Sequence, residues 1–299
     1  MGEPSGPPTA GSVSIVIPAH DEAATIARLL ESLLDGAMPG EFEVIVVCNG
    51  CTDRTAEIAR GFGVQVVELT EPSKAAALAH GDTQAQHFPR IYLDADIEVS
   101  AATVRALSMA LDGTVIAAGP QRLLQADGAS LLVRAYYAVW TRLPQVRAGL
   151  FGRGVVAVSA VGHERTRTLP AVMSDDLAMS EAFGPSERTV VADAVAVIRP
   201  PRNLRDLLRR RIRVTTGNAQ LDQTGARSAE AKTSWGDLAR IVRDEPRLAG
   251  CVPVFVGVAL ASRIVARRRV RAGDFSTWLR DDSSRGAGRS KTRRRRFLS

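Results

Sequence analysis

The sequence predicts an α/β protein built on a doubly wound sheet, and two features of its first hundred residues support this prediction. Short apolar runs rich in valine and isoleucine alternate with stretches whose apolar residues recur at helical spacing, and the connections are short. Polar residues also cluster directly after three of the predicted strands. Ligands of doubly wound sheets bind beyond the carboxyl ends of the strands, so these clusters are candidates for a functional site.

The elements follow in order along the first part of the chain. Four strands are predicted, each a short apolar run that fits a buried parallel strand: residues 13–17, 42–47, 64–67 and 90–93. Three helices are predicted between them, at residues 22–34, 52–62 and 74–87. Thr52, followed by Asp53, is a suitable cap for the second of these helices.

The second half of the chain is less regular. It is predicted to contain a strand at residues 115–118 and helices at residues 130–142, 177–183 and 204–214. Residues 149–154 include three glycines, so we expect this segment to be flexible.

Two common nucleotide-binding signatures are missing from the sequence. No G-x-G-x-x-G follows the first predicted strand, and G-x-x-x-x-G-K-[ST] occurs nowhere in the chain. A dinucleotide-binding domain of the usual kind and a P-loop are therefore disfavoured.

The net charge of +7 is concentrated at the C-terminal end. Residues 263–299 hold 13 basic and 3 acidic residues, whereas the preceding 262 residues hold 26 basic and 29 acidic ones. A nucleic-acid-binding domain usually carries its basic excess on a folded face, and the 5% aromatic content is low for a surface that stacks bases. We therefore expect no specific nucleic-acid partner, and interpret the basic end as suited to an anionic membrane surface.

The three cysteines are Cys48, Cys51 and Cys251. Cys48 and Cys51 have the C-x-x-C spacing found in redox and zinc sites, although a zinc site would need two further soft ligands. A small, odd number of cysteines is typical of a reducing compartment, which favours a cytoplasmic location.

Both ends of the chain are expected to differ from its body. Residues 1–11 are rich in proline, glycine and serine and are predicted to be disordered, with no visible signal peptide. Residues 248–266 are apolar but contain Pro253 and are interrupted by Arg263, which leaves about 15 uncharged residues where a membrane span needs ~20. A helix lying in a membrane interface and a buried helix of the domain both remain open.

The sequence Asp94-Ala-Asp96 directly follows a predicted strand. Two carboxylates at this spacing on a loop can face one small volume, where a cation would relieve their repulsion. Ligation by oxygen alone favours Mn²⁺ or Mg²⁺, which could in turn hold a diphosphate. The alternative is that these residues only accept hydrogen bonds in the turn that ends the strand.

Four segments occur in an order that resembles the donor half of family 2 glycosyltransferases of the GT-A fold. They are Ser14-Ile-Val-Ile-Pro-Ala-His-Asp-Glu22, Val46-Val-Cys-Asn-Gly-Cys-Thr-Asp-Arg-Thr55, Lys74-Ala-Ala-Ala-Leu-Ala-His-Gly81 and Tyr92-Leu-Asp-Ala-Asp96. The resemblance is strongest over residues 12–100 and extends less closely to about residue 215. It implies a GT-A (Rossmann-like) mixed sheet with flanking helices, followed here by a C-terminal helical appendage.

The resemblance also implies a donor-binding site. Pro18, Ala19 and Glu22 would line the nucleotide pocket, and Asn49 and Asp53 would stand where the family's aspartates meet the base and ribose. Because Asn49 replaces the usual acidic residue, and an amide donates as well as accepts hydrogen bonds, the identity of the base is left open.

The remaining implied roles concern the phosphates, the metal and the base. Lys74 would lie near the nucleotide or its phosphates, Asp94 would contact ribose or sugar, and Asp96 would ligate the metal. Asp175 and Asp176 match, less closely, the acidic pair whose second member is the family's general base. Asp176 is therefore the candidate base, supported by Asp175, with N-capping of the following helix as the alternative.

Several further residues are weaker candidates for contacts to phosphate or acceptor. Arg209, Arg210, Arg211 and Arg213 resemble a basic motif of some processive members, but the tryptophan of that motif is missing. Arg210 and Arg213 could clamp a phosphate, or could lie on a solvated helix face. His163 could be an extra metal ligand, or simply a histidine with its hydrogen bonds satisfied in the fold.

Together these observations predict a glycosyltransferase of the hexosyltransferase class, inverting and dependent on Mn²⁺ or Mg²⁺. It would transfer sugar from a nucleotide-diphosphate sugar to a hydroxyl acceptor, which could be a lipid, a glycan or a small molecule. A sugar-phosphate nucleotidyltransferase and a non-catalytic module that binds nucleotide sugar or membrane are the alternatives.

The expected organisation has four parts. A disordered N-terminus at residues 1–11 precedes a GT-A domain at residues 12–225, a helical segment at 226–280 for which membrane association is one alternative, and a basic disordered tail at 281–299. The expected location is cytoplasmic, with peripheral attachment at the inner face of the plasma membrane.

Overall fold

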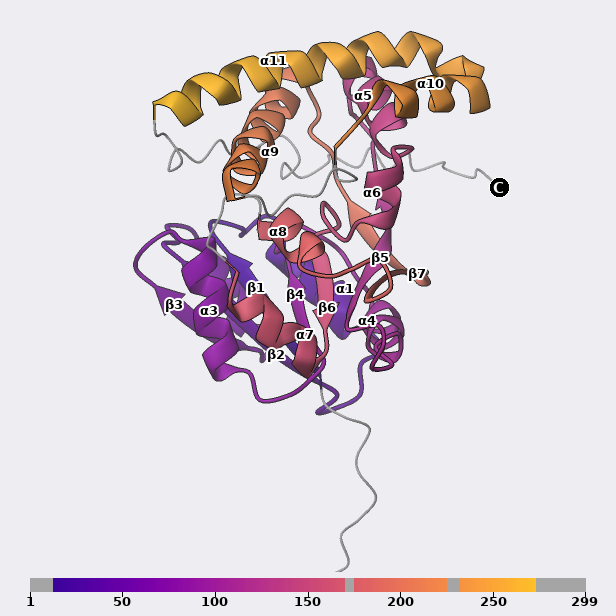
Figure 1. Cartoon of the computed structure of the whole chain (residues 1–299). Helices are drawn as coiled ribbons and strands as arrows, with labels where there is room; N and C mark the ends of the chain where they lie inside the picture. The colour runs from indigo at the N-terminus through magenta and orange to yellow at the C-terminus, as the bar shows by residue number, and fades with distance from the viewer. Residues whose placement is uncertain (1–12, 170–174, 225–231, 273–299) are drawn as a thin grey trace, which may run out of the picture.

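A computed structural model describes residues 13–169, 175–224 and 232–272 (Figure 1). The expected disordered N-terminus, the basic tail and Ser174 lie outside these residues. Within these residues, seven strands form one sheet: β1 Val13–Ala19, β2 Phe42–Asn49, β3 Gln65–Leu69, β4 Arg90–Leu93, β5 Ala117–Leu124, β6 Val155–Val158 and β7 Arg188–Ile198. Their spatial order is β3-β2-β1-β4-β6-β5-β7.

The sheet is mixed. β3, β2, β1 and β4 are parallel to one another, whereas β6 runs antiparallel to both β4 and β5. Because β6 is reversed, its first residue, Val155, pairs with Leu93 at the carboxyl end of β4. The chain entering β6 is thereby brought to the edge of the sheet where β1, β2 and β4 end.

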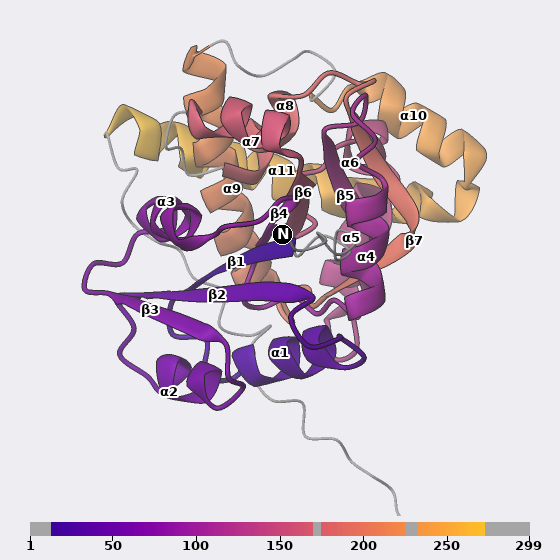
Figure 2. The same ribbon diagram turned by 90° about the horizontal axis from the view of Figure 1, so that it is seen from below.

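Helices cover both faces of the sheet (Figure 2). The helices that flank it are α1 Ile26–Leu34, α2 Thr55–Arg60, α3 Lys74–Gln84, α4 Ala101–Met109 and α7 Ala160–Arg167. Successive strand residues point to opposite faces of the sheet. Ile15 and Ile17 therefore belong to the core shared with α1 and α4. Val16 lies in a cluster on the opposite face, where α3 packs against β1 and β2. On α1, Ile26, Leu29, Leu30 and Leu33 are fully buried. Burial of each contributes about 1.5–3 kcal/mol.

A second layer of helices lies beyond the sheet and is drawn at the top of Figure 1. The remaining helices are α5 Leu131–Trp140, α6 Pro144–Ala148, α8 Asp175–Glu181, α9 Leu204–Thr224, α10 Trp235–Asp244, the 3₁₀ helix η1 Pro246–Cys251 and α11 Val252–Arg271. Residues of α5, α9, α10, η1 and α11 share one apolar core. Within it the rings of Tyr136 and Phe255 stack with centroids 5.3 Å apart.

Several predicted boundaries were wrong for local reasons. The first helix begins at Ile26 and not at residue 22, because the carbonyl of Glu22 closes a turn by accepting from the amides of Thr25 and Ile26. The second begins at Thr55, whose amide donates to the carboxylate of Asp53, whereas the Thr52 amide donates to Asp21 outside the helix. The third helix ends at Gln84 and not at residue 87.

The second half departed further from expectation. The strand predicted at residues 115–118 runs from Ala117 to Leu124, and β6 and β7 were not predicted at all. β6 has only four residues, and β7 has an irregular register opposite Pro120 and Gln121 that interrupts the periodic pattern. Short and irregular strands carry little periodic signal in the sequence.

Candidate functional site

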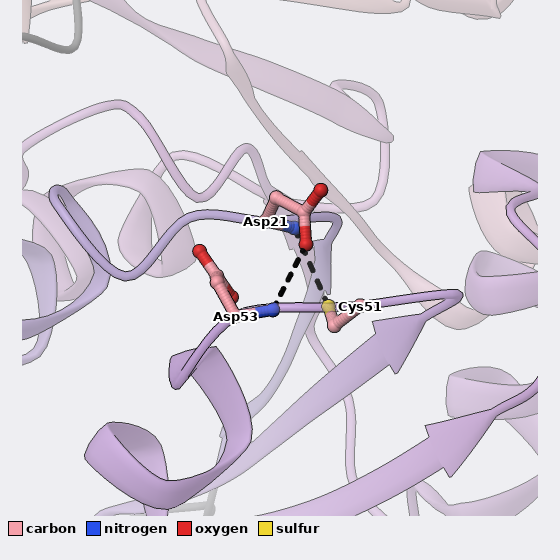
Figure 3. Close-up of side chains that lie close together, drawn as sticks. All are labelled: Asp21, Cys51 and Asp53. Atoms are coloured by element: carbon pink, nitrogen blue, oxygen red, sulfur yellow. Dashed lines mark hydrogen bonds between the residues drawn. The ribbon is translucent and has the colours of Figure 1, made fainter.

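The candidate site lies at the edge of the sheet where β1, β2 and β4 end. The loop after β1 and the loop after β2 are connected there by side-chain hydrogen bonds (Figure 3). The carboxylate of Asp21 accepts from the amide of Thr52 at 2.7 Å, and the carboxylate of Asp53 accepts from the amide of Ala23 at 3.0 Å. Each loop therefore holds the other through an aspartate, which fixes the place of Asp53.

The loop after β2 also needs a glycine. Gly50 has φ +60°, and a Cβ atom there would approach the backbone nitrogen of Pro72 to 2.8 Å. A side chain would be strained in this conformation and would collide with the loop after β3. The glycine of the Cys48-Asn-Gly-Cys51 segment thus lets two loops meet behind the candidate site.

Asn49 and Glu22 are both buried at this edge. The side-chain amide of Asn49 donates to the carbonyl of Ala19 at 2.8 Å, so it joins the ends of β1 and β2. Glu22 accepts from the hydroxyl of Thr25 at 2.8 Å, and its backbone amide donates to Thr55. Pro18 and Ala19 form the last part of β1 itself.

The two neighbouring cysteines have different chemical character. A hydrogen bond with Cys48 lowers the pKa of Cys51 to about 7, while the same bond and burial raise the pKa of Cys48. Ligand atoms of Asp21, Cys51 and Asp53 lie within 4.8 Å of one another, and Figure 3 shows their proximity. All three side chains accept hydrogen bonds from backbone amides, which accounts for the cluster as a connection between loops.

Lys74 and Asp94 form an ion pair. The Lys74 Nζ atom lies 2.8 Å from the Asp94 carboxylate, and both side chains are partly exposed. Lys74 is the first residue of α3, where Ser73 caps the helix by accepting from the amide of Ala76. The capped helix therefore brings a cation from the loop after β3 to the carboxylate that follows β4.

The orientation of Asp96 follows from the burial of its two neighbours in the sequence. Ala95 and Ile97 are buried in the main core, whereas Asp96 between them is only half-buried. The alternation directs the two carboxylates of the Asp94-Ala-Asp96 segment away from the core. Carboxylate oxygens of this kind suit a hard divalent cation.

Asp176 is brought to the same edge by residues 149–154. Its Oδ2 atom accepts from the amide of Gly152 at 2.7 Å, and the amide of Asp94 donates to the carbonyl of Gly154 at 2.8 Å. Gly152 and Gly154 are two residues apart, so their Cα atoms are at most ~7 Å apart. Residues 152–154 thus link Asp94, which follows β4, to Asp176 of α8, which lies 82 positions later in the chain.

Gly154 allows this close approach. It has φ +67°, and a Cβ atom would collide with Ile97 at 2.3 Å and lie 3.4 Å from the Asp94 carboxylate. The expectation that residues 149–154 are flexible is therefore not supported by their contacts, because the loop is held from several sides.

Arg153, which is buried, and Arg122, which is half-buried, account for much of this order, and neither was predicted from the sequence. Arg122 on β5 donates to the carbonyls of Gly152, Val146 and Phe151. Arg153 is 1% exposed and donates to the carbonyls of Gly149, Pro120 and Arg147, among others. Burial and the neighbouring Arg153 lower the pKa of Arg122, whereas the Asp176 carboxylate acts to raise it. In the sequence, Arg122 lies shortly after the strand predicted at residues 115–118, and Arg153 lies within residues 149–154. Neither position by itself distinguishes a buried arginine from an exposed one.

The weaker candidates lie in other surroundings. His163 is buried on α7, where its Nδ1 atom is 2.9 Å from the Tyr92 hydroxyl and its ring contacts Phe88. Burial lowers its pKa. Arg210 and Arg213 are half-buried on α9, which packs against α11 and α5. Asp175 is the first residue of α8.

Comparison with known proteins finds a family match in the first half of the chain. Residues 14–153 match the family model described as glycosyl transferase family 2. A curated 4,4'-diaponeurosporenoate glycosyltransferase of Staphylococcus aureus (strain bovine RF122 / ET3-1) is 35% identical over 92 residues, which cover 29% of this chain. The same enzyme from strain USA300 is 34% identical over the same length. The chain spans only 24% of the length of these relatives.

Solved structures extend the likeness of the fold to most of the chain. A mannosyltransferase from Pyrobaculum calidifontis, in complex with GDP-Man and Mn²⁺, matches with TM-score 0.60 and 21% identity over 89% of this chain and 80% of its own. Glucosyl-3-phosphoglycerate synthase from Mycobacterium tuberculosis, in complex with Mn²⁺, UDP-glucose and phosphoglyceric acid, matches with TM-score 0.55 and 20% identity over 74% of this chain and 82% of its own. The predicted GT-A-like mixed sheet with flanking helices and a C-terminal helical region is thereby confirmed.

Proposed function

Because residues 14–153 match the model of glycosyl transferase family 2, we propose that this chain transfers a sugar from a nucleotide-diphosphate sugar to a hydroxyl acceptor. The observation that carries the proposal is the meeting of Lys74, Asp94 and Asp176 at one edge of the sheet. The Lys74–Asp94 ion pair and the Gly152–Gly154 segment bring together groups from α3, β4 and α8. This is the edge at which an α/β sheet binds its ligands.

The donor would bind along the loops after β1 and β2. Pro18, Ala19 and Glu22 would line the nucleotide pocket, with Asn49 and Asp53 near the base and ribose. The hydrogen bonds between the two loops support this arrangement, because a pre-formed pocket loses less conformational entropy on binding. Lys74 would neutralise phosphate charge, and Asp94 would contact the ribose or the sugar.

A divalent cation fits the oxygen ligands at this edge. Asp96 would hold it, and Mn²⁺ is the ion in complex with both solved transferases described above. Mg²⁺ has the same preference for oxygen ligands. When bound, such an ion supplies positive charge that stabilises the departing diphosphate.

Asp176 would act as the general base. Its carboxylate would take the proton of the acceptor hydroxyl as the hydroxyl oxygen forms a bond to the anomeric carbon. The bond from that carbon to the diphosphate breaks in the same step, and the anomeric configuration inverts. The amides of Gly152 and Leu177 donate to the two carboxylate oxygens, which orients the group. Asp175 would support it, and Arg210 and Arg213 would contact phosphate or acceptor.

The wider assignments are proposed on the same basis. Residues 12–225 would form the transferase domain and residues 226–280 the helical segment that follows. Both donor and acceptor would be met in the cytoplasm. The acceptor hydroxyl is left open among lipid, glycan and small molecule.

A panel of nucleotide sugars tests the proposal. The protein is incubated with UDP- and GDP-linked hexoses and Mn²⁺, and release of the nucleoside diphosphate is measured with and without a chelator. We expect slow metal-dependent hydrolysis of one donor class even without the natural acceptor. Formation of a nucleotide sugar from a nucleoside triphosphate and a sugar 1-phosphate would instead identify a nucleotidyltransferase. Donor binding without any turnover in the presence of cell-derived acceptors would identify a non-catalytic module.

A further inference from the structure

We propose that α11 docks this protein on an anionic bilayer, lying along the surface with its outer face toward the lipid. The outer face consists of the exposed residues Pro253, Gly257, Leu260, Arg263, Ile264, Val265, Arg267, Arg268 and Arg271. This interaction surface does not depend on the proposed transferase activity.

The helix has two faces with different surroundings. Phe255, Val258, Ser262 and Ala266 are almost completely buried, and α11 packs on α9, α5 and η1. Leu260 and Ile264 on the opposite side are 51% and 54% exposed. A helix with one face in a protein core and apolar residues exposed on the other suits an interface between protein and lipid.

The charge of this segment is uniformly positive. Between Glu245 and Asp274 the sequence contains six arginines and no acidic residue. Four of the arginines belong to the outer face: Arg263 lies between Leu260 and Ile264, and Arg267, Arg268 and Arg271 follow the apolar residues. Their long side chains can reach lipid phosphates while the apolar residues enter the headgroup boundary. This complementarity selects an anionic bilayer among the possible occupants of the face.

The same packing argues against a spanning helix. By length and composition, residues 246–271 could cross a membrane, and only 22% of the most apolar window is buried in the fold. Yet a span would separate Phe255 and Val258 from Tyr136 and the rest of the second core. A span of about 20 residues beginning at Pro246 would also include Arg263, and a charged side chain in the hydrocarbon is costly.

The position of α11 relative to the candidate site fits this role. In Figure 1, α8 lies between the sheet and the layer of α9 and α11. A protein docked through α11 would thus present the side that carries α8 and α9 toward the membrane.

Vesicle flotation of the full chain tests the proposal. Vesicles of phosphatidylcholine alone are compared with vesicles that also contain phosphatidylglycerol. We expect binding only to the anionic vesicles, with loss of binding as the Debye length falls from about 10 Å at 0.1 M salt to about 3 Å at 1 M. Arg267→Glu with Arg268→Glu should weaken binding by at least about 25-fold, since each basic residue near the surface contributes roughly fivefold.

Matched variants separate the outer face from general effects. Leu260→Glu with Ile264→Glu should abolish flotation, whereas Met109→Glu, at an 84% exposed position on α4, should leave it unchanged. Unchanged thermal unfolding of these variants shows that the fold is intact.

Four results would overturn the proposal. The first is equal binding to neutral vesicles, and the second is retention that resists both high salt and alkaline carbonate, which would indicate a span. The third is unchanged binding of both double variants, which would assign binding to another part of the chain. The fourth is a dimer that forms in solution through Leu260 and Ile264 without any binding to vesicles.

Discussion

Two regions contribute to the candidate site in different ways. The first consists of the loops after β1, β2 and β4, and the second is the segment that positions Asp176. In the first region each group follows a strand of the same parallel set, and Asp21, Asn49 and Asp53 bond to backbone about 30 residues away or less. In the second region Asp176 is placed by Gly152, and Gly152 by Arg122 on β5. The first region is thus organised by strand order, and the second by arginines that bind carbonyl oxygens.

The two apolar cores show the same contrast. The sheet core is formed by strands and helices that alternate along the chain. The second core packs α5 against η1 and α11, which lie more than a hundred residues later in the chain. The ion pair Arg142–Glu245 connects the same two parts of the chain. A motif that depends on strand order can be read from a short sequence, whereas one that depends on distant packing cannot. The following experiments test this contrast, from the largest expected effect to the smallest.

Asp96→Ala should have the largest effect. We expect loss of metal-dependent donor binding and a fall in activity of at least ~10³-fold, because a metal can supply several kcal/mol of charge stabilisation in such a reaction. Calorimetric titration of donor with Mn²⁺ measures the binding. Asp127→Ala, at an exposed aspartate of a different loop, is the control and should bind normally. Unchanged donor affinity of the Asp96 variant, with and without chelator, would contradict the assignment in the strand-ordered region.

Asp176→Asn tests the second region. The amide keeps the size of the side chain but cannot take the acceptor proton, so kcat should fall by ~10²–10⁴ while donor affinity barely changes. Steady-state kinetics and donor titration give the two quantities. Near-normal turnover would place the base elsewhere, and NMR of the product anomer would then decide between inversion and retention.

Phe255→Ala tests whether α11 is part of the fold or an appendage to it. Phe255 is 6% exposed and stacks on Tyr136, so we expect a loss of about 3–5 kcal/mol in the free energy of unfolding. Leu260→Ala on the exposed face of the same helix should cost about 0.5 kcal/mol or less. Urea unfolding measures both. Equal effects of the two substitutions would mean that α11 does not pack on α5 as described.

Arg122→Met tests the placement of Asp176 by the arginines. Without the guanidinium, the carbonyls of Phe151 and Gly152 lose their donor, and a small displacement of the base should lower kcat about tenfold or more. The donor KM should change little, and Arg122→Lys should restore part of the activity. Arg134→Met on the exposed side of α5 is the control. A fall in stability with normal kcat would give Arg122 a structural role only.

The alkylation rate of Cys51 is the measurement with the smallest expected effect. Since its pKa is lowered to about 7, the thiolate fraction and the rate of alkylation should rise through pH 7 and level off above about pH 8. Cys48 should stay unreactive, because burial and the bond to Cys51 raise its pKa. Donor nucleotide with Mn²⁺ should slow the alkylation several-fold, as followed by mass spectrometry. Failure of any nucleotide to protect Cys51 would argue against a pocket at these two loops.

The sequence by itself determined the alternating α/β order, the carboxyl edge as the place of the candidate site, and Asp53, Asp94 and Asp96 as candidates there, whereas Lys74 was implied only by the resemblance to the family. It could do so because parallel strands end at one edge, so residues that follow strands meet without further information. It also determined the basic, apolar character of the segment that became α11.

Only the tertiary structure decided how the second half completes this edge. The reversal of β6, the left-handed conformation of Gly152 and Gly154, the burial of Arg153 and the hydrogen bonds of Arg122 depend on partners far away in the chain. The Lys74–Asp94 ion pair and the division of α11 into a packed face and an exposed face were decided in the same way. Packing between distant segments leaves no local period in the sequence, because the energy that fixes each residue comes from its partner and not from its neighbours in the chain.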